Sequence, residues 1–237
     1  MAVQQKIQDG LAKLGVFVQL KPPHEIRRRI ALLGHHAIDT VLDVGANVGQ
    51  YAGELRHFGY GGTIHSFEPL SDAFRILNDA ARSDARWHTH QMALGSAPGE
   101  GEINVSRNSY SSSLRDLMPG HLAGAPDSAY VRKEKITIST VADQLAALAV
   151  TGNDVWLKID TQGFEREVLL GAEPTLAQIK VIQLEISLQP LYDQGMELEE
   201  TLAYFAKKGY ELVGMEPGFY NKETGHQLQV DGIFVRK

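Results

Sequence analysis

The sequence contains no cysteine among its 237 residues. This absence excludes disulfide bonds, thiolate metal sites and a cysteine nucleophile. Long hydrophobic runs are lacking too: no stretch of 18 apolar residues occurs, so we expect no membrane span. Residues 1–10 are polar and lack the apolar segment of a secretory signal, which leads us to expect a cytoplasmic protein.

Positive charge is also scarce. The formal net charge is −6 at pH 7, and Arg27 to Arg29 form the only basic run. Proteins that bind nucleic acids usually present a basic face, so this balance predicts no nucleic-acid partner. We interpret the arginine run as a solvated helix face. The length predicts one large domain, or a domain with a small appendage, and a hydrophobic content of 43% is enough for a full core.

The chain is organised around residues 40–51. Residues 40–44 are mostly apolar, as in a buried parallel strand, and Gly45 and Gly49 follow in a turn. From Tyr51 onward the apolar residues recur at the spacing of a helix face. Strand, glycine turn and helix form the opening unit of a nucleotide-binding α/β domain, in which glycine lets a ligand approach the backbone closely.

Asp43, at the end of this strand, indicates which nucleotide binds. The dinucleotide pattern G-x-G-x-x-G is broken, because Asn47 and Gln50 stand at its second and third glycine positions. A carboxylate at position 43 would repel a pyrophosphate but would suit a cationic ligand. The pattern D-x-G-x-x-x-G is similar to motif I of class I S-adenosylmethionine (SAM) methyltransferases. An ordinary strand–turn–helix with a surface aspartate is the alternative.

Glu68 supports the SAM interpretation. Residues 63–67 predict the next strand, and Glu68 and Pro69 follow it about 20 residues beyond the glycine turn. An α/β nucleotide fold places a carboxylate there, where it can accept hydrogen bonds from both ribose hydroxyls.

Two further carboxylates are the candidate catalytic groups. Residues 154–159 predict a strand that ends at Asp160, and residues 180–186 predict one that carries Glu185 to the same edge. Asp160 could act as general base, hold the amino group of SAM or orient the acceptor. The two carboxylates could share a proton or bind Mg²⁺, but two ligands are too few to predict a metal site.

The remaining segments have less specific roles. Residues 1–38 predict a helical segment that caps the sheet or shapes the substrate mouth, and residues 39–237 form the catalytic domain. Residues 107–130 lack periodicity and predict a lid, a binding loop or a flexible linker. We expect substrate contacts from Ser112, Ser113, Tyr192 and Tyr220.

Taken together, the motifs resemble the FkbM family of SAM-dependent methyltransferases. The matching segments are VLDVGANVGQY at 41–51, FEP at 67–69, ALG at 93–95, LKIDTQGFE at 157–165, QLEI at 183–186 and DGIFVR at 231–236. One departure is Gln162, where the family often has glutamate.

The resemblance implies a Rossmann-like α/β fold of class I, with a mostly parallel seven-stranded sheet, an antiparallel terminal strand and helices on both faces. It implies SAM contacts from Asp43, Gly45, Ala46, Asn47, Gly49, Tyr51, Glu68, Pro69, Ala93 and Asp160. It also implies O-methylation of a hydroxyl on a small molecule or glycan, commonly on a sugar of a glycolipid, polysaccharide or glycosylated natural product. The alternatives are methylation of a non-sugar small molecule, such as a macrolide or an aromatic hydroxyl, and a SAM-binding module without catalysis.

Overall fold

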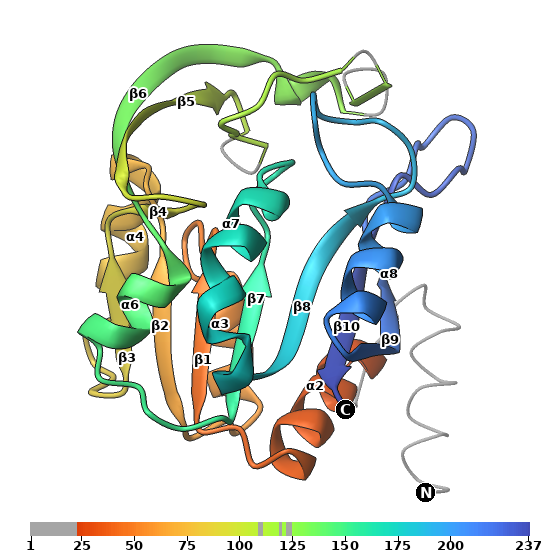
Figure 1. The fold of residues 1–237 in the computed structure, drawn as a ribbon. Helices are drawn as coiled ribbons and strands as arrows, with labels where there is room; N and C mark the ends of the chain where they lie inside the picture. The colour runs from red at the N-terminus through yellow and green to blue at the C-terminus, as the bar shows by residue number, and fades with distance from the viewer. Residues whose placement is uncertain (1–22, 109–110, 119, 122–124) are drawn as a thin grey trace, which may run out of the picture.

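A seven-stranded sheet forms the centre of the protein in the computed structural model, which describes residues 23–108, 111–118, 120–121 and 125–237 (Figure 1). Its strand order is β3-β2-β1-β7-β8-β10-β9. These strands are β1 (Thr40–Val44), β2 (Thr63–Phe67), β3 (Trp87–His90), β7 (Val155–Ile159), β8 (Ile179–Ser187), β9 (Tyr210–Pro217) and β10 (Gln229–Arg236). The strands from β3 to β8 in this order run parallel, whereas β10 is antiparallel to both of its neighbours. The predicted mostly parallel sheet with an antiparallel terminal strand is therefore confirmed.

Helices cover both faces of the sheet, as predicted. One face carries α2 (His24–His35), α3 (Gln50–His57) and α4 (Ser71–Ala81), and the other carries α6 (Val141–Ala147), α7 (Glu165–Ala172) and α8 (Leu198–Lys207). Successive β1 residues alternate between the two cores: Val41 packs with α2 to α4, and Leu42 packs with α6 to α8. Burial on both faces explains why this strand is a nearly continuous apolar run.

A second sheet arches over the carboxyl edge of the first. It consists of β4 (Ala93–Leu94), β5 (Gly99–Ser106) and β6 (Tyr130–Ser139) in the order β4-β6-β5 (Figure 1). The sequence predicts only short strands in this part of the chain. The two long strands pair antiparallel, and Ile103 and Ile136 share a buried hydrophobic cluster with Leu70 and Ala73. The described part of segment 107–130, which includes the short helix η1 (Pro126–Ser128), connects these strands above the sheet edge.

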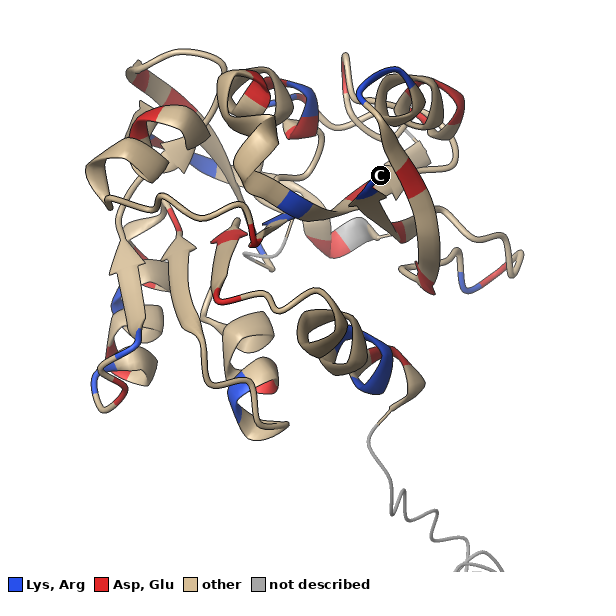
Figure 2. Ribbon diagram, turned by 60° about the horizontal axis from the view of Figure 1, so that its bottom comes forward, with Lys and Arg blue, Asp and Glu red and all other residues tan. Residues whose placement is uncertain are grey.

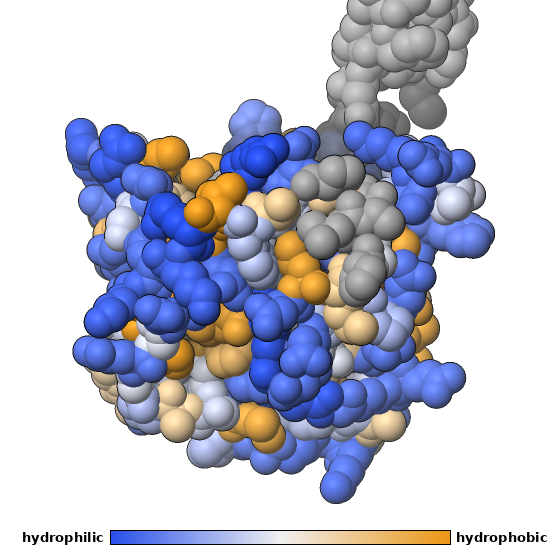
Figure 3. Space-filling view, turned by 90° about the horizontal axis from the view of Figure 1, so that it is seen from above, coloured by the Kyte–Doolittle hydropathy of each residue, from blue (hydrophilic) through white to orange (hydrophobic). Residues whose placement is uncertain are grey.

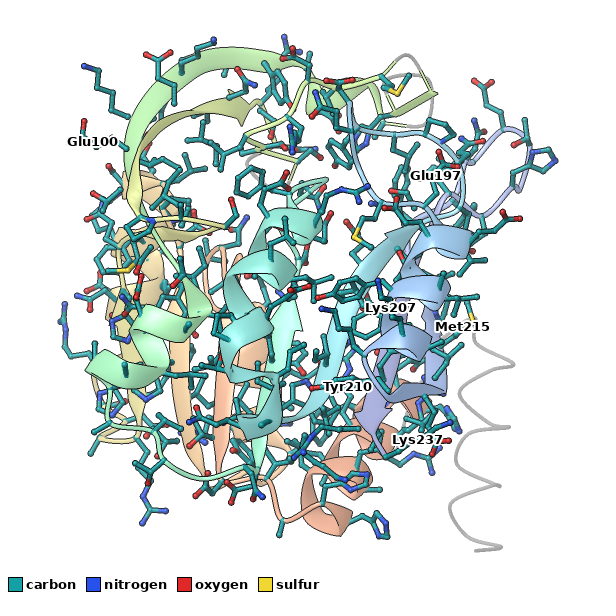
Figure 4. The ribbon with its side chains drawn as sticks, viewed as in Figure 1. Glu100, Glu197, Lys207, Tyr210, Met215 and Lys237 are labelled. Atoms are coloured by element: carbon teal, nitrogen blue, oxygen red, sulfur yellow. The ribbon has the colours of Figure 1, made fainter. Side chains whose placement is uncertain are left out.

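Helix α2 is anchored to the edge of the sheet. Ile26 is buried in the core. Arg28 donates a hydrogen bond to the backbone carbonyl of Met215, which lies on the edge strand β9 and is labelled in Figure 4. Arg29 pairs with Glu216 at 2.5 Å. Only Arg27 of the basic run is exposed, so the interpretation of this run as a solvated face is wrong for Arg28 and Arg29. Figure 2 shows an acidic residue beside the basic ones on this helix.

The predicted appendage extends beyond the described part of the chain. Residues 1–22 of this segment lie outside the described residues, and a domain boundary at residue 38 stays a prediction. None of the described helices has both the length and the apolar character needed to cross a membrane.

Candidate active site

A cavity of about 660 Å³ opens at the carboxyl edge of the central sheet. Its volume lies in the range of about 300–1,000 Å³ that is typical of ligand pockets. The site residues that the sequence predicts and that line it are Gly45, Ala46, Asn47, Tyr51, Glu68, Pro69, Ser112, Asp160 and Glu185. They come from the ends of four neighbouring strands, from α3 and from segment 107–130, which is where ligands bind in open α/β sheets. Viewed onto this edge, the surface is mainly hydrophilic, with small hydrophobic patches (Figure 3).

Asp43 lies beneath the cavity rather than in its lining. Its side chain is fully buried, accepts a hydrogen bond from Ser66 Oγ at 3.2 Å and forms an ion pair with Lys158 Nζ at 3.2 Å. Asp43 and Lys158 face each other because they are register partners in the parallel pair β1 and β7. The structure therefore gives Asp43 a supporting position below the turn, and its predicted direct contact with the cofactor stays a prediction.

Lys158 connects the turn after β1 with the end of β7. Its Nζ donates to the backbone carbonyl of Gly45 at 3.2 Å and lies 3.5 Å from Asp160 Oδ2. Burial alone would lower the pKa of Lys158, but the carboxylates of Asp43 and Asp160 outweigh burial and raise it. Lys158 therefore stays charged and holds both loops at the cavity floor.

The two glycines of the turn have different functions. Gly45 has a φ of +76°, and a Cβ there would lie 1.8 Å from the backbone oxygen of Asp160. Gly49 has a φ of +90°, and a Cβ there would lie 2.9 Å from the side chains of Leu77 and Trp87. Gly45 thus lets the turn pass close to the end of β7, whereas Gly49 allows packing against α4 and β3 outside the cavity lining.

Glu68 is held at the cavity wall by two backbone donors. Its Oε2 accepts a hydrogen bond from the amide of Asn47 at 2.9 Å, and its Oε1 accepts one from the amide of Leu70 at 2.9 Å. Burial raises the pKa of the Glu68 carboxyl to about 7 in spite of these bonds. Each oxygen keeps a lone pair that can accept a further hydrogen bond from a ligand.

Asp160 and Glu185 lie on the same cavity wall, as the sequence predicts. Strand β7 neighbours β1, and the amide of Asp160 donates to the backbone oxygen of Val44 at 3.0 Å. Gln162 Nε2 donates to Asp160 Oδ1 and to Glu185 Oε2, each at 2.8 Å, and Gln229 Nε2 also donates to Glu185 Oε2 at 2.6 Å. Burial, followed by the negative charge of Asp160, raises the pKa of Glu185.

The turn after Asp160 is fixed by Glu165. Its Oε1 accepts hydrogen bonds from the backbone amides of Thr161 at 3.0 Å and Gly163 at 3.1 Å. Burial raises the pKa of the Glu165 carboxyl to about 7. The glutamate at the end of the 160–165 segment therefore accepts hydrogen bonds from the backbone of the turn that precedes it, which explains its spacing from the aspartate and the glycine.

The predicted substrate residues occupy different environments. Ser112 lines the cavity, whereas Ser113 is buried and donates from Oγ to the backbone oxygen of Gln162 at 2.5 Å. Tyr192 is buried and donates from its hydroxyl to Gln162 Oε1. Tyr220 is 52% exposed and does not line the cavity. The structure thus brings only Ser112 of these four into the cavity wall. Ala93, predicted near the cofactor, also lies outside the lining.

Sequence reasoning missed several cavity residues. Lys158 could have been predicted from the sequence. A lysine within an apolar strand needs a buried partner, and the period of two places Lys158 on the same face of the strand as Asp160. Asp231 faces Glu185 across the antiparallel pair β8 and β10, and burial raises its pKa to about 6. His121 lies in a segment without periodicity and carried no signal.

The cavity fits SAM by the chemistry of its donors and acceptors. Gly45 and Ala46 line it at the turn after β1, and Glu68 presents acceptor positions for a pair of hydroxyls. The charged lining is mainly acidic, which suits a sulfonium cation. Within the described ranges, no group of three or more histidine, aspartate and glutamate side chains is arranged to hold a metal ion.

Comparisons with known proteins identify the family of the chain. A family model described as "Methyltransferase FkbM domain" matches residues 43–212. The 31-O-demethyl-FK506 methyltransferase FkbM of Streptomyces tacrolimicus is 26% identical over 223 residues, which cover 80% of this chain and 79% of that protein.

Two solved structures share the fold at low sequence identity. A putative O-methyltransferase from Klebsiella pneumoniae has a TM-score of 0.50 at 8% identity, covering 98% of this chain and 89% of that one. An uncharacterized protein from Listeria monocytogenes serotype 4b has a TM-score of 0.50 at 7% identity, covering 92% of this chain and 69% of that one. Because the FkbM family model matches residues 43–212, which is more than half of the chain, the chain belongs to the FkbM family of SAM-dependent methyltransferases.

Proposed function

We propose that this enzyme transfers a methyl group from SAM to a hydroxyl of a sugar, in a glycolipid, a polysaccharide or a glycosylated natural product. The observation that carries the proposal is the Asp160 carboxylate at the end of β7. Its side chain is 40% exposed and faces the cavity beside Glu185. A carboxylate that is open to the cavity can accept the proton that a hydroxyl loses when it becomes methylated.

The residues of the turn and of β2 form the cofactor half of the cavity. In the proposal, Glu68 accepts hydrogen bonds from the ribose hydroxyls, and Gly45 and Ala46 let the backbone pass close to the ligand. When bound, SAM supplies a methyl group that its sulfonium already activates. The work of the protein is therefore to orient the acceptor oxygen and to take its proton.

Asp160 performs the proton step in this proposal. The hydroxyl oxygen bonds to the methyl carbon while the carbon–sulfur bond breaks. The electron pair of that bond stays on sulfur, and the proton passes to Asp160. A positioned general base contributes typically about 10²–10⁴-fold to the rate, and alignment of the reactants contributes about 7–11 kcal/mol.

The acceptor half of the cavity carries many hydrogen-bonding groups. Its wall combines the amides of Gln183 and Gln229 with the hydroxyl of Ser112 and the ring of Phe219. Amides, hydroxyls and an aromatic face suit a polyhydroxylated ring, because each hydroxyl can both donate and accept.

Product analysis tests the proposed function. The enzyme is incubated with SAM labelled in the methyl group and with separate panels of sugars and glycosides, macrolides, aromatic alcohols and RNA. We expect label in an O-methyl ether of the glycoside panel, identified by mass spectrometry. Asp160→Asn should lower kcat by at least about 100-fold while SAM affinity, measured by calorimetry, stays within twofold. Asp79→Asn, which changes an exposed carboxylate, should behave like the wild type.

Two results would overturn this function. Full turnover in Asp160→Asn would remove Asp160 from the proton step. Tight SAM binding without methyl transfer to any panel would favour a module that binds SAM without catalysis.

A non-sugar hydroxyl is the second candidate acceptor. The Streptomyces relative is named as a methyltransferase of 31-O-demethyl-FK506, and the macrolide panel tests whether this chain shares that kind of acceptor.

A further inference from the structure

Gln162 lies between the two candidate catalytic carboxylates. Its Nε2 is 2.8 Å from Asp160 Oδ1 and 2.8 Å from Glu185 Oε2. Because one nitrogen bonds both oxygens, the two carboxylates lie within the range of about 4–6 Å in which the charge of Asp160 raises the pKa of Glu185. The carboxamide thus supplies both of its N–H groups to the pair.

The direction of this amide is fixed from its other side. The hydroxyl of Tyr192 donates to Gln162 Oε1, so the nitrogen faces the carboxylates. Ser113 Oγ donates to the backbone oxygen of Gln162 at 2.5 Å. Gln162 has a φ of +55°, which is unusual for a residue other than glycine, and these contacts hold it there.

The surrounding charges make the pair asymmetric. Lys158 Nζ lies 3.5 Å from Asp160 Oδ2 and stabilises a negative charge on Asp160. Glu185 is more buried and faces other acidic groups, so it retains a proton more readily. The titratable groups that face the pair are Lys158 on β7, Glu165 on α7, Asp231 on β10 and the phenol of Tyr192.

We propose that Gln162 is the positioning residue of the methyl transfer, because its carboxamide nitrogen holds Asp160 and Glu185 together at one point of the cavity. The proposal rests on the proposed function, in which Asp160 takes the proton of the acceptor hydroxyl. Asp160 then acts as base, beside Glu185, whose pKa is raised by burial and by the charge of Asp160. The two N–H groups of this amide bridge the two carboxylates by hydrogen bonds.

The pH dependence of turnover separates this function from a purely structural one. Gln162→Met keeps the length of the side chain and removes both N–H groups. Hydrogen bonds to a carboxylate favour its ionised form, so their loss raises the pKa of the pair. The acidic limb of the kcat profile should therefore move to higher pH by about one unit, which corresponds to a tenfold change in proton affinity.

A second variant and a control accompany the measurement. Gln162→Glu keeps the shape and replaces the donor with an acceptor, so its acidic limb should move at least as far. Gln194→Met is the matched control, because Gln194 also has a left-handed backbone, with a φ of +57°, but lies outside the cavity lining. Its pH profile should equal that of the wild type. Calorimetry with SAM should give all four proteins the same affinity within twofold.

The outcomes distinguish the two proposals. An inactive wild type, or a fully active Asp160→Asn, would defeat the proposed function. An active wild type and an inactive Asp160→Asn, with an unmoved acidic limb in Gln162→Met, would defeat the positioning function alone. A limb that moves only in Gln162→Glu would also defeat it, since added charge rather than lost hydrogen bonds would then be the cause.

Discussion

The ion pair of Lys158 and Asp43 gives the sharpest prediction about stability. The Lys158 side chain is 9% exposed and the Asp43 side chain is fully buried, so water screens this pair little. Removal of one partner of a buried pair costs about 3–5 kcal/mol, since the other charge stays buried without compensation. In Lys158→Met, Asp43 would keep only its hydrogen bond from Ser66. We therefore expect the free energy of unfolding to fall by about 3–5 kcal/mol.

Thermal and urea unfolding measure this loss. A change of 1 kcal/mol shifts the Tm of a protein of this size by about 2–4 °C, so the Tm should fall by about 6–20 °C. Trp156 is fully buried in the same strand as Lys158, and its fluorescence reports the transition. Lys207→Met is the control, because Lys207 is exposed on α8 (Figure 4). This change should cost less than about 0.5 kcal/mol.

A double-mutant cycle identifies the cause. Asp43→Asn removes the buried charge, so the double variant Asp43→Asn/Lys158→Met should be less destabilised than the sum of the single changes by at least about 2 kcal/mol. The raised pKa of Lys158 determines how the contribution of the ion pair to stability changes with pH. The pair contributes fully below the ordinary lysine value of about 10.4, and its contribution is lost as pH rises through the raised pKa. A loss under 1 kcal/mol in Lys158→Met, or strictly additive effects, would refute the reasoning.

Three further predictions concern the cofactor half and helix α2. Glu68→Gln should weaken SAM binding about 10- to 100-fold, because hydrogen bonds to charged groups contribute about 1.5–3 kcal/mol. Wild-type affinity should rise as pH increases through about 7, where the Glu68 carboxyl ionises, and calorimetry in the variant should show a flat profile. Gly45→Ala should abolish SAM binding, because its Cβ would meet a backbone oxygen at 1.8 Å, whereas Gly53→Ala on α3 meets nothing within 4 Å and should bind SAM normally. Arg29→Met should lower the unfolding free energy by about 3 kcal/mol, because it leaves a buried carboxylate on β9 without its closest cation, and the exposed Arg27→Met should change it by less than about 0.5 kcal/mol.

The sequence predicts well which strand ends line the cavity, because the signals for these strands are local. Each of the strands β1, β2 and β7 is a short run of mostly buried residues, followed by Gly45, Glu68 and Asp160 in turn, and parallel strands bring their carboxyl ends to one edge. The positions of Gly45, Glu68 and Asp160 in the cavity follow from that rule. Asp43 shows its limit. Asp43 and Lys158 are opposite each other in the register of β1 and β7 and form an ion pair, whereas Asp43 lies outside the cavity lining. The register of two strands cannot be read from the sequence of either one.

The acceptor half could not be predicted in the same way, because its contacts join distant parts of the chain. Asp231 approaches Glu185 through antiparallel pairing, and Arg29 reaches the cavity wall from α2. Tyr192 meets Gln162 from a loop that no periodic pattern describes. Such contacts depend on strand order and register, which hydrophobic patterns do not specify.

The antiparallel strand β10 explains how one edge of the sheet serves two ligands. The parallel strands β2, β1 and β7 reach this edge at their carboxyl ends and present Glu68 and Asp160. Strand β10 runs the opposite way, so its first residues, Gln229 and Asp231, lie beside Glu185 near the end of β8. In the proposed function, the parallel strands hold the cofactor, and β10 with the loop before it forms the acceptor wall. Changes in residues 219–231 can therefore alter acceptor choice while the motifs that bind SAM stay intact.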